Sequence, residues 1–241
     1  MALMEFLTNM FPLFAVLNSG LFFRLSVAEM AVAAYITLKL MWLKFLLLWR
    51  FFRLWALTDG VAAPENMLRC MSNNYSLEQF WKGWHASFNK WIVTYLYLPL
   101  GGRKNRTLAV WAVFLFVAVW HDIELKLLVW GALNSVFFVL EVMAKRISRT
   151  KIMLELPPSL VHLICSLSGA LYIMILIAVN LVGYAVGVDG ISGIYGKFVT
   201  WDGLKVLGVS IYFLTVGTSL MIVLEQRKCP VPRKEEKVGV E

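Results

Sequence analysis

The apolar residues of this chain form long unbroken stretches, separated by short polar and basic segments. A helix needs about 20 predominantly apolar residues to cross a bilayer, whereas a membrane β-strand shows roughly ten residues of alternating polarity. The stretches here do not alternate, so they predict helices. We expect about five spans, supplied by residues 4–23, 28–49, 107–120 with 125–144, 159–188 and 203–224.

The composition agrees with this interpretation. The 241 residues are 60% hydrophobic and 16% charged, whereas a soluble domain usually carries about 25% charged residues. One soluble core cannot bury so much apolar surface, so the bilayer must act as part of the solvent. We predict an all-α, polytopic helical membrane protein, with a single embedded domain at residues 1–224 and a polar cytoplasmic tail at residues 225–241.

The net charge of +8 is typical of membrane topology and does not indicate a nucleic-acid partner. The basic residues cluster between the apolar stretches, at Arg50 and Arg53, residues 103–106, residues 145–151, and Arg227 with Lys228. All four clusters lie on one side if residues 77–102 enter and leave the membrane by the same face. The positive-inside rule then makes that side cytoplasmic.

Residues 77–102 are rich in aromatic side chains, but they make a poor membrane span. Lys82, His85, Asn89 and Lys90 interrupt the apolar pattern. Aromatic rings favour the depth of the lipid headgroups, so we expect an interfacial or re-entrant helix here. Pro99 and the two glycines that follow it are expected to stop this helix.

Two histidines in these apolar surroundings are candidates for chemistry. His85 and Asn89 are four residues apart, so on one helix they share a face, which Trp81 and Phe88 bracket. His121 lies where residues 107–120 meet residues 125–144, and we expect it near the bend of a hairpin or a long bent pair. Ionisable groups inside membranes are functional candidates by default, and imidazole is suited to general-base work near neutral pH.

Other residues give weaker signals. Glu124 is close enough in sequence to contact His121, either to orient it or simply to end a helix. For His162, which has only serines as near polar neighbours, we expect a structural hydrogen bond between helices. No nucleotide-binding glycine loop, G-x-S-x-G elbow or H-E-x-x-H helix is present in the sequence. The three cysteines, far apart, predict neither a metal site nor a disulfide framework.

The two histidine segments together resemble a known family. Phe80-Trp81-x-x-Trp84-His85-x-Ser87-Phe88-Asn89-x-Trp91, followed by Pro99-Leu100-Gly101-Gly102, is similar to the first signature of membrane-bound O-acyltransferases. Trp120-His121, which follows at the expected spacing, is similar to the second. The sequence from Val119 to Gly131 resembles most the Gup-type branch, the eukaryotic glycerol-uptake and GPI-anchor-remodelling proteins. That branch is about twice as long as this chain, so the resemblance predicts a C-terminal portion that lacks further helices.

The resemblance implies specific roles for these residues. His121 matches the catalytic histidine of the family, and His85 matches its second polar position. The implied reaction moves an acyl group from acyl-CoA, a co-substrate and not a bound cofactor, to a hydroxyl of a lipid or lipid-linked acceptor. Candidate substrate contacts are Trp84, Asn89, Arg103, Lys104 and Arg106, the last three for the phosphates of CoA.

The resemblance also implies the endoplasmic reticulum as the compartment and a GPI-anchor lipid as the acceptor. Two alternatives to an active enzyme remain open at this point. One is a glycerol or polyol transporter, although the sequence lacks the internal repeat typical of transporters. The other is a catalytically inactive partner, because the helices that the chain lacks would wall part of the cavity.

Overall fold

The described part of the chain is built from helices. The computed structural model describes Glu5, residues 13–18 and residues 20–228, and its only pairing of extended backbone within those ranges is an isolated bridge between Met67 and Trp84. The predicted all-α class is therefore confirmed. The elements are α2 (Leu13–Asn18), η1 (Leu21–Arg24), α3 (Val27–Thr58), α4 (Leu77–Gly83), α5 (Ala86–Ile92), η2 (Val93–Tyr97), α6 (Arg106–His121), α7 (Leu125–Ile147), α8 (Lys151–Glu155), α9 (Pro158–Leu181), η3 (Val182–Val186), α10 (Ile191–Phe198) and α11 (Trp201–Lys228).

Four helices in the described ranges are long and apolar enough to cross a membrane, namely Val27–Thr58, Leu125–Ile147, Pro158–Val186 and Trp201–Arg227. Helix α6 is apolar but shorter. The number is below the expected five because the first predicted stretch is interrupted where it is described. Helix α2 ends at Asn18, and Gly20 adopts a left-handed φ of 73° before η1 begins. Residues 4, 6–12 and 19 of that prediction lie outside the described residues.

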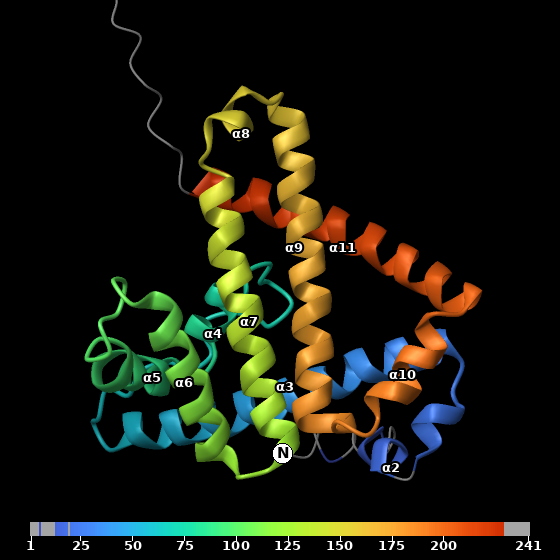
Figure 1. The fold of residues 1–241 in the computed structure, drawn as a ribbon. Coiled ribbons are helices and arrows are strands. Elements are labelled where there is room, and N and C mark those ends of the chain that lie inside the picture. The colour runs from blue at the N-terminus through green and yellow to red at the C-terminus, as the bar shows by residue number, and fades with distance from the viewer. Residues whose placement is uncertain (1–4, 6–12, 19, 229–241) are drawn as a thin grey trace, which may run out of the picture.

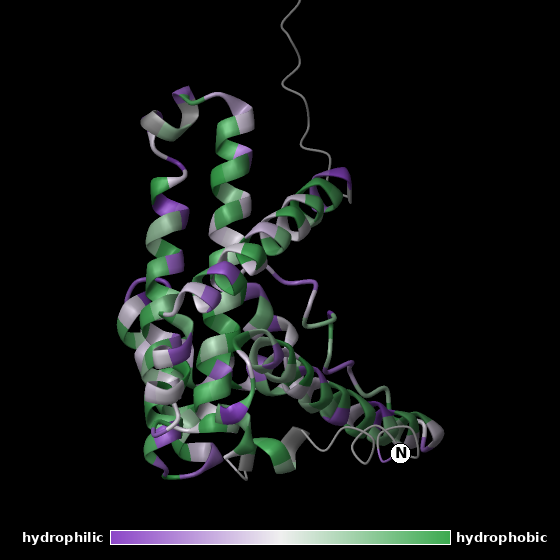
Figure 2. Ribbon diagram, turned by 90° about the vertical axis from the view of Figure 1, so that its right-hand side faces the viewer, coloured by the Kyte–Doolittle hydropathy of each residue, from purple (hydrophilic) through white to green (hydrophobic). Residues whose placement is uncertain are grey.

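The long helices cross one another instead of forming a parallel bundle. Helices α7 and α9 lie side by side and run in opposite directions, and the short helix α8 joins their ends (Figure 1). Helix α3 crosses this pair at one end, and α11 packs obliquely against α9. Figure 2 shows apolar residues along most of the long helices, with hydrophilic residues toward their ends and connections. This distribution suits helices that face lipid along their middle parts.

The ends of these helices follow local sequence signals. Ser26 begins α3 with a capping box, because its hydroxyl accepts a hydrogen bond from the Glu29 amide while the Glu29 carboxylate accepts one from the Ser26 amide. Pro158 occupies the first position of α9, where its missing N–H costs nothing. Gly60, with a φ of 77°, follows the end of α3 and turns the chain.

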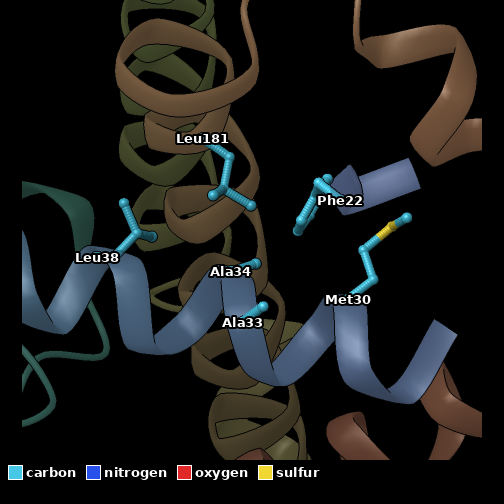
Figure 3. Close-up of a cluster of buried hydrophobic side chains, with 6 residues drawn as sticks. All are labelled: Phe22, Met30, Ala33, Ala34, Leu38 and Leu181. Carbon is cyan, nitrogen blue, oxygen red and sulfur yellow. The ribbon is translucent and has the colours of Figure 1, made fainter. Parts of the chain in front are cut away.

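The crossing of α3 and α9 is held by a cluster of buried apolar side chains (Figure 3). Phe22 from η1 and Leu181 from α9 pack onto the face of α3 that carries Ala33 and Ala34. Lipid tails are as apolar as these side chains, so close van der Waals contact stabilises the crossing more than water exclusion does. The two alanines allow the helices to approach closely.

Small and polar residues form the contact between α9 and α11. A Cβ atom added to Gly169 would lie 2.4 Å from Cγ2 of Thr218, so only glycine fits at this position. The Nε2 atom of His162 lies 2.7 Å from Oγ of Ser219, on the facing helix. This contact is the interhelical hydrogen bond predicted for His162, and it gives that histidine a structural task.

The structure adds helical residues on both sides of the last predicted span. Residues 190–202, between the predicted spans 159–188 and 203–224, contain helix α10, which packs against α11. Helix α11 continues to Lys228, so residues 225–228 of the predicted tail are helical. Residues 229–241 of that tail lie outside the described residues.

Candidate active site

The hairpin of α6 and α7 positions His121. A Cβ atom on Gly131 of α7 would lie 2.9 Å from the carbonyl oxygen of Phe114 and 3.2 Å from Cβ of Ala118, both on α6. The two helices therefore meet at backbone distance. His121 is the last residue of α6, and Asp122 is already extended. The predicted hairpin with His121 at its bend is confirmed.

Aromatic rings lie against the imidazole of His121, which stays exposed on its other side. Its ring centroid lies 4.8 Å from that of Trp120, 6.3 Å from that of Trp130 and 5.6 Å from that of Tyr184. Glu124, which we considered as its orienting partner, instead forms an ion pair with Lys126 at 2.5 Å. Within the described residues no hydrogen bond joins Glu124 to His121. The imidazole is thus held by packing and keeps its nitrogens available.

The first signature is two short helices and not the single helix that the sequence predicted. Helix α4 ends at Gly83, α5 begins at Ala86, and His85 between them adopts a left-handed φ of 47°. Asn66 stabilises this break, because its carbonyl oxygen accepts a hydrogen bond from the Ala86 amide and its side-chain oxygen accepts one from the Ser87 amide. Left-handed backbone in a residue other than glycine often marks a functional site.

This break changes which side chains share a face. Phe88 still stacks on His85, with ring centroids 5.2 Å apart. Trp81, expected on the same face, belongs to the separate helix α4, where its Nε1 donates a hydrogen bond to Asn134 at 3.1 Å, and it lines the same pocket as His85 and Phe88. The backbone N–H of Asn89 donates to the carbonyl oxygen of His85, as at the start of a helix.

Both histidines line one cavity of about 1510 Å³. A series of ring contacts connects them along its wall: Trp49 to His85 at 4.5 Å, His85 to Phe88 at 5.2 Å, Phe88 to Trp120 at 4.6 Å, and Trp120 to His121 at 4.8 Å. The predicted residues Trp84, Asn89, Arg103 and Arg106 line the same cavity. Lys104 does not, so the structure separates it from the other predicted site residues.

The cavity has a basic end opposite His121. Arg106 starts α6 and His121 ends it, so a rise of 1.5 Å per residue places their backbones about 22 Å apart. Arg103, Lys145, Arg146 and Arg149 also line the cavity. Two of the basic clusters that the sequence assigned to one side of the membrane thus meet in the folded chain.

Acidic residues fix part of this basic end. Glu78 forms ion pairs with Lys82 at 2.8 Å, Lys145 at 3.0 Å and Arg106 at 3.2 Å. Burial disfavours its charge, but the hydrogen bonds from Lys82 and Lys145 outweigh that effect and lower the pKa of Glu78 to about 2. Glu141, which is almost fully buried, accepts hydrogen bonds from the Ser76 hydroxyl and the Glu78 amide and so caps α4 from α7.

Three residues near His121 were missed from the sequence. Tyr184 and Asn180 line the cavity from the end of the α9 span, and Trp130 lines it from α7. The Nε1 atom of Trp130 donates a hydrogen bond to Oδ1 of Asn180 at 3.2 Å. The polar Asn180 within an otherwise apolar span was the signal that could have identified this region. Within the described ranges, no three His, Cys, Asp or Glu side chains lie close enough together to hold a metal ion.

Comparison with known proteins decides the family. The family model described as MBOAT, membrane-bound O-acyltransferase family, matches residues 1–186, which include both histidines and Tyr184. The chain belongs to the membrane-bound O-acyltransferase family. The match and the four long apolar helices make this MBOAT chain an integral membrane protein.

Individual relatives agree with the Gup-type branch of the MBOAT family. The chain is 37% identical to the membrane-bound O-acyltransferase GUP1 of Saccharomyces cerevisiae, over 93% of this chain and 40% of the relative. It is 41% identical to GUP1 of Millerozyma farinosa, over 92% of this chain and 44% of the relative. A more distant relative, the protein-cysteine N-palmitoyltransferase HHAT of Mus musculus, is 30% identical over 62% of this chain and 32% of the relative. The chain thus spans less than half the length of these curated relatives.

Proposed function

We propose that this MBOAT chain transfers an acyl group from acyl-CoA to a hydroxyl of a lipid or lipid-linked acceptor, with His121 as the general base. One observation carries the proposal: His85 and His121, from separate segments, line one cavity whose other end is basic. Its volume of about 1510 Å³ exceeds the roughly 300–1,000 Å³ of ordinary small-molecule sites. A large cavity with a basic end and apolar walls suits a long substrate with a charged head and an apolar tail.

The length of α6 supports a donor with two distant ends. Its basic start and His121 are about 22 Å apart along the helix. Phosphates bound by Arg103 and Arg106 therefore require an extended arm to bring a thioester to His121. Guanidinium groups favour phosphate because they donate paired hydrogen bonds. Lys104 does not line the cavity, so we assign it only to the basic cluster that sets the membrane topology.

The chemistry follows from a base beside an apolar wall. His121 accepts the proton of the acceptor hydroxyl as the oxygen attacks the thioester carbon. The tetrahedral intermediate carries its negative charge on the former carbonyl oxygen, and His85 or Asn89 donates a hydrogen bond to it. When the C–S bond breaks, the CoA thiolate leaves and takes the proton from the imidazolium of His121. The products are the ester, free CoA and a neutral histidine.

The acceptor and the compartment rest on the family resemblance alone. A GPI-anchor lipid and the endoplasmic reticulum are the branch-level expectations, and both remain proposals. The assay should therefore offer a total lipid extract as acceptor, with the acylated product identified by mass.

The test compares two histidine variants in membranes depleted of related enzymes. Labelled palmitoyl-CoA is supplied, and wild type is compared with His121→Ala and with His162→Gln, which keeps a hydrogen-bonding group toward Ser219. Loss of a general base should lower the rate of transfer by about 10²–10⁴-fold in His121→Ala, whereas His162→Gln should transfer at the rate of wild type. Stable insertion of all three without transfer would contradict the enzyme and favour an inactive partner. Glycerol flux that persists in His121→Ala, without acyl transfer by wild type, would favour the transporter.

A further inference from the structure

A single π-helical turn ends the α9 span directly beside His121. This turn, η3, covers Val182–Val186 and carries Tyr184. Gly183 allows it to lie flat on Trp130, because a Cβ atom there would be 2.7 Å from Cδ1 of the indole. The hydrogen bond from Trp130 to Asn180 fixes the same indole from the preceding turn. Isolated π-helical turns within helices are frequent at functional sites because they redirect one side chain.

The side chain that this turn directs is Tyr184. Its ring centroid lies 5.6 Å from that of His121, at an interplanar angle of 77°, and 5.5 Å from that of Trp130. Tyr184 and His121 line the same cavity. Two ring contacts thus hold the phenol of Tyr184 beside His121, the proposed general base.

The hydroxyl of Tyr184 has no protein partner in the described ranges. Tyr184 is only partly buried, and it lines the cavity, so its hydroxyl stays accessible from that side. By contrast, the hydroxyl of Tyr75 donates to Glu225 at 2.6 Å. An unpaired phenol that faces a cavity is available to a ligand that enters it.

We propose that Tyr184 is a catalytic residue that donates a hydrogen bond to the carbonyl oxygen of the acyl donor. The proposal rests on the function proposed above and adds a second donor beside the one from the first signature. As the acceptor oxygen attacks, the carbonyl oxygen gains negative charge and the hydrogen bond from the Tyr184 hydroxyl strengthens. The tyrosine keeps its proton throughout, and His121 alone takes and returns the proton of the reaction.

The experiment removes the hydroxyl and keeps the ring. Tyr184→Phe is compared with wild type and with Tyr212→Phe, a change on α11 at a side chain that is 65% exposed. Loss of one oxyanion donor should lower kcat by about 10²–10³-fold, with KM for palmitoyl-CoA within about twofold because the contact strengthens only in the transition state. Tyr212→Phe should match wild type. A kcat for Tyr184→Phe within about twofold of wild type would overturn the assignment, and so would a change confined to KM.

A second substitution guards against a purely structural effect. With 3-fluorotyrosine at position 184 the ring and a hydroxyl remain, and kcat should stay within about threefold of wild type. If this variant loses as much rate as Tyr184→Phe, hydrogen-bond donation is not the role of Tyr184. The results also separate the two proposals. Transfer by wild type that needs His121 but not the Tyr184 hydroxyl overturns only the present one, whereas absence of transfer by wild type overturns both.

Discussion

His121 ends a regular helix of 16 residues, whereas His85 lies at a left-handed break between two helices of seven residues each. The first is positioned by close packing of α6 on α7, and the second by hydrogen bonds from Ala86 and Ser87 to the distant Asn66. The two imidazoles of one cavity are thus positioned by different interactions. Two histidines that stand out equally in the sequence signatures can therefore have different local structures. Paired substitutions at the two sites test this difference.

The largest expected effect comes from the different space around a glycine in each of the two segments. In Gly131→Ala the new Cβ would lie 2.9 Å from the Phe114 carbonyl oxygen, so the hairpin must open. Overpacking of this kind costs about 1–3 kcal/mol, and the shift of α6 should also lower acyl transfer. The measurements are the melting temperature in detergent and the transfer rate.

Gly83→Ala is the matched control in the first signature. At Gly83 the nearest atom to a new Cβ is 3.9 Å away, so alanine fits and improves helix propensity. A Gly131→Ala variant as stable as Gly83→Ala would refute the close packing proposed for the hairpin.

A smaller effect is expected when each histidine is replaced by glycine and by alanine. The difference in stability between the two variants should have opposite signs at positions 85 and 121. At position 85 the φ of 47° favours glycine, and alanine should be less stable than glycine by about 1–2 kcal/mol. At position 121, the last residue of α6, the backbone is still helical, so His121→Gly should be the less stable variant, by less than the roughly 1 kcal/mol that glycine costs in a helix interior. Chemical unfolding of the four variants gives the two differences. If the stability difference between glycine and alanine had the same sign at both positions, the two sites would not differ in backbone conformation as described.

The smallest effect concerns pH and the ion pairs of α4. The folded pKa of Glu78, about 2, lies below its usual 4.5, so the carboxylate stabilises the fold fully above pH 4.5 and loses that contribution as pH falls toward 2. Because the group is partly solvated, the change is small. Melting temperatures measured from pH 5.5 to 3 should therefore fall less in Glu78→Gln than in wild type. Asp202→Asn, in an exposed pair with Lys205, serves as the control. Identical slopes for wild type and Glu78→Gln would show that Glu78 does not stabilise α4.

The sequence predicted the features that depend on local pattern. Hydropathy identified the α6–α7 hairpin, the α9 and α11 spans and the position of His121 at a bend, because lipid requires long apolar runs and polar breaks between them. The paired signatures identified the family, which the family match confirms. The roles of His85, His121, Asn89 and the basic residues stay predictions.

The features that the sequence did not predict depend on partners far along the chain. The break at His85 requires Asn66, about 20 residues earlier, and a left-handed conformation is uncommon for any residue other than glycine, so the sequence does not predict it here. Tyr184 meets His121 only because the π turn η3 lies on Trp130, which belongs to another helix. Hydropathy gives each span but not the crossing of α3 and α9, which is fixed by the side chains at their contact.

The buried carboxylate of Glu141 also sets an order of assembly during synthesis. It caps α4 through the amide of Glu78, which is 63 residues earlier in the chain. At about 5–20 residues per second, α4 leaves the ribosome roughly 3–13 s before its cap does. During that interval the Glu78 amide needs another acceptor, whereas the Gln79 amide can already donate to the hydroxyl of Ser76, which directly precedes α4. The cap on the Glu78 amide can therefore form only after the helix that follows His121 has been made.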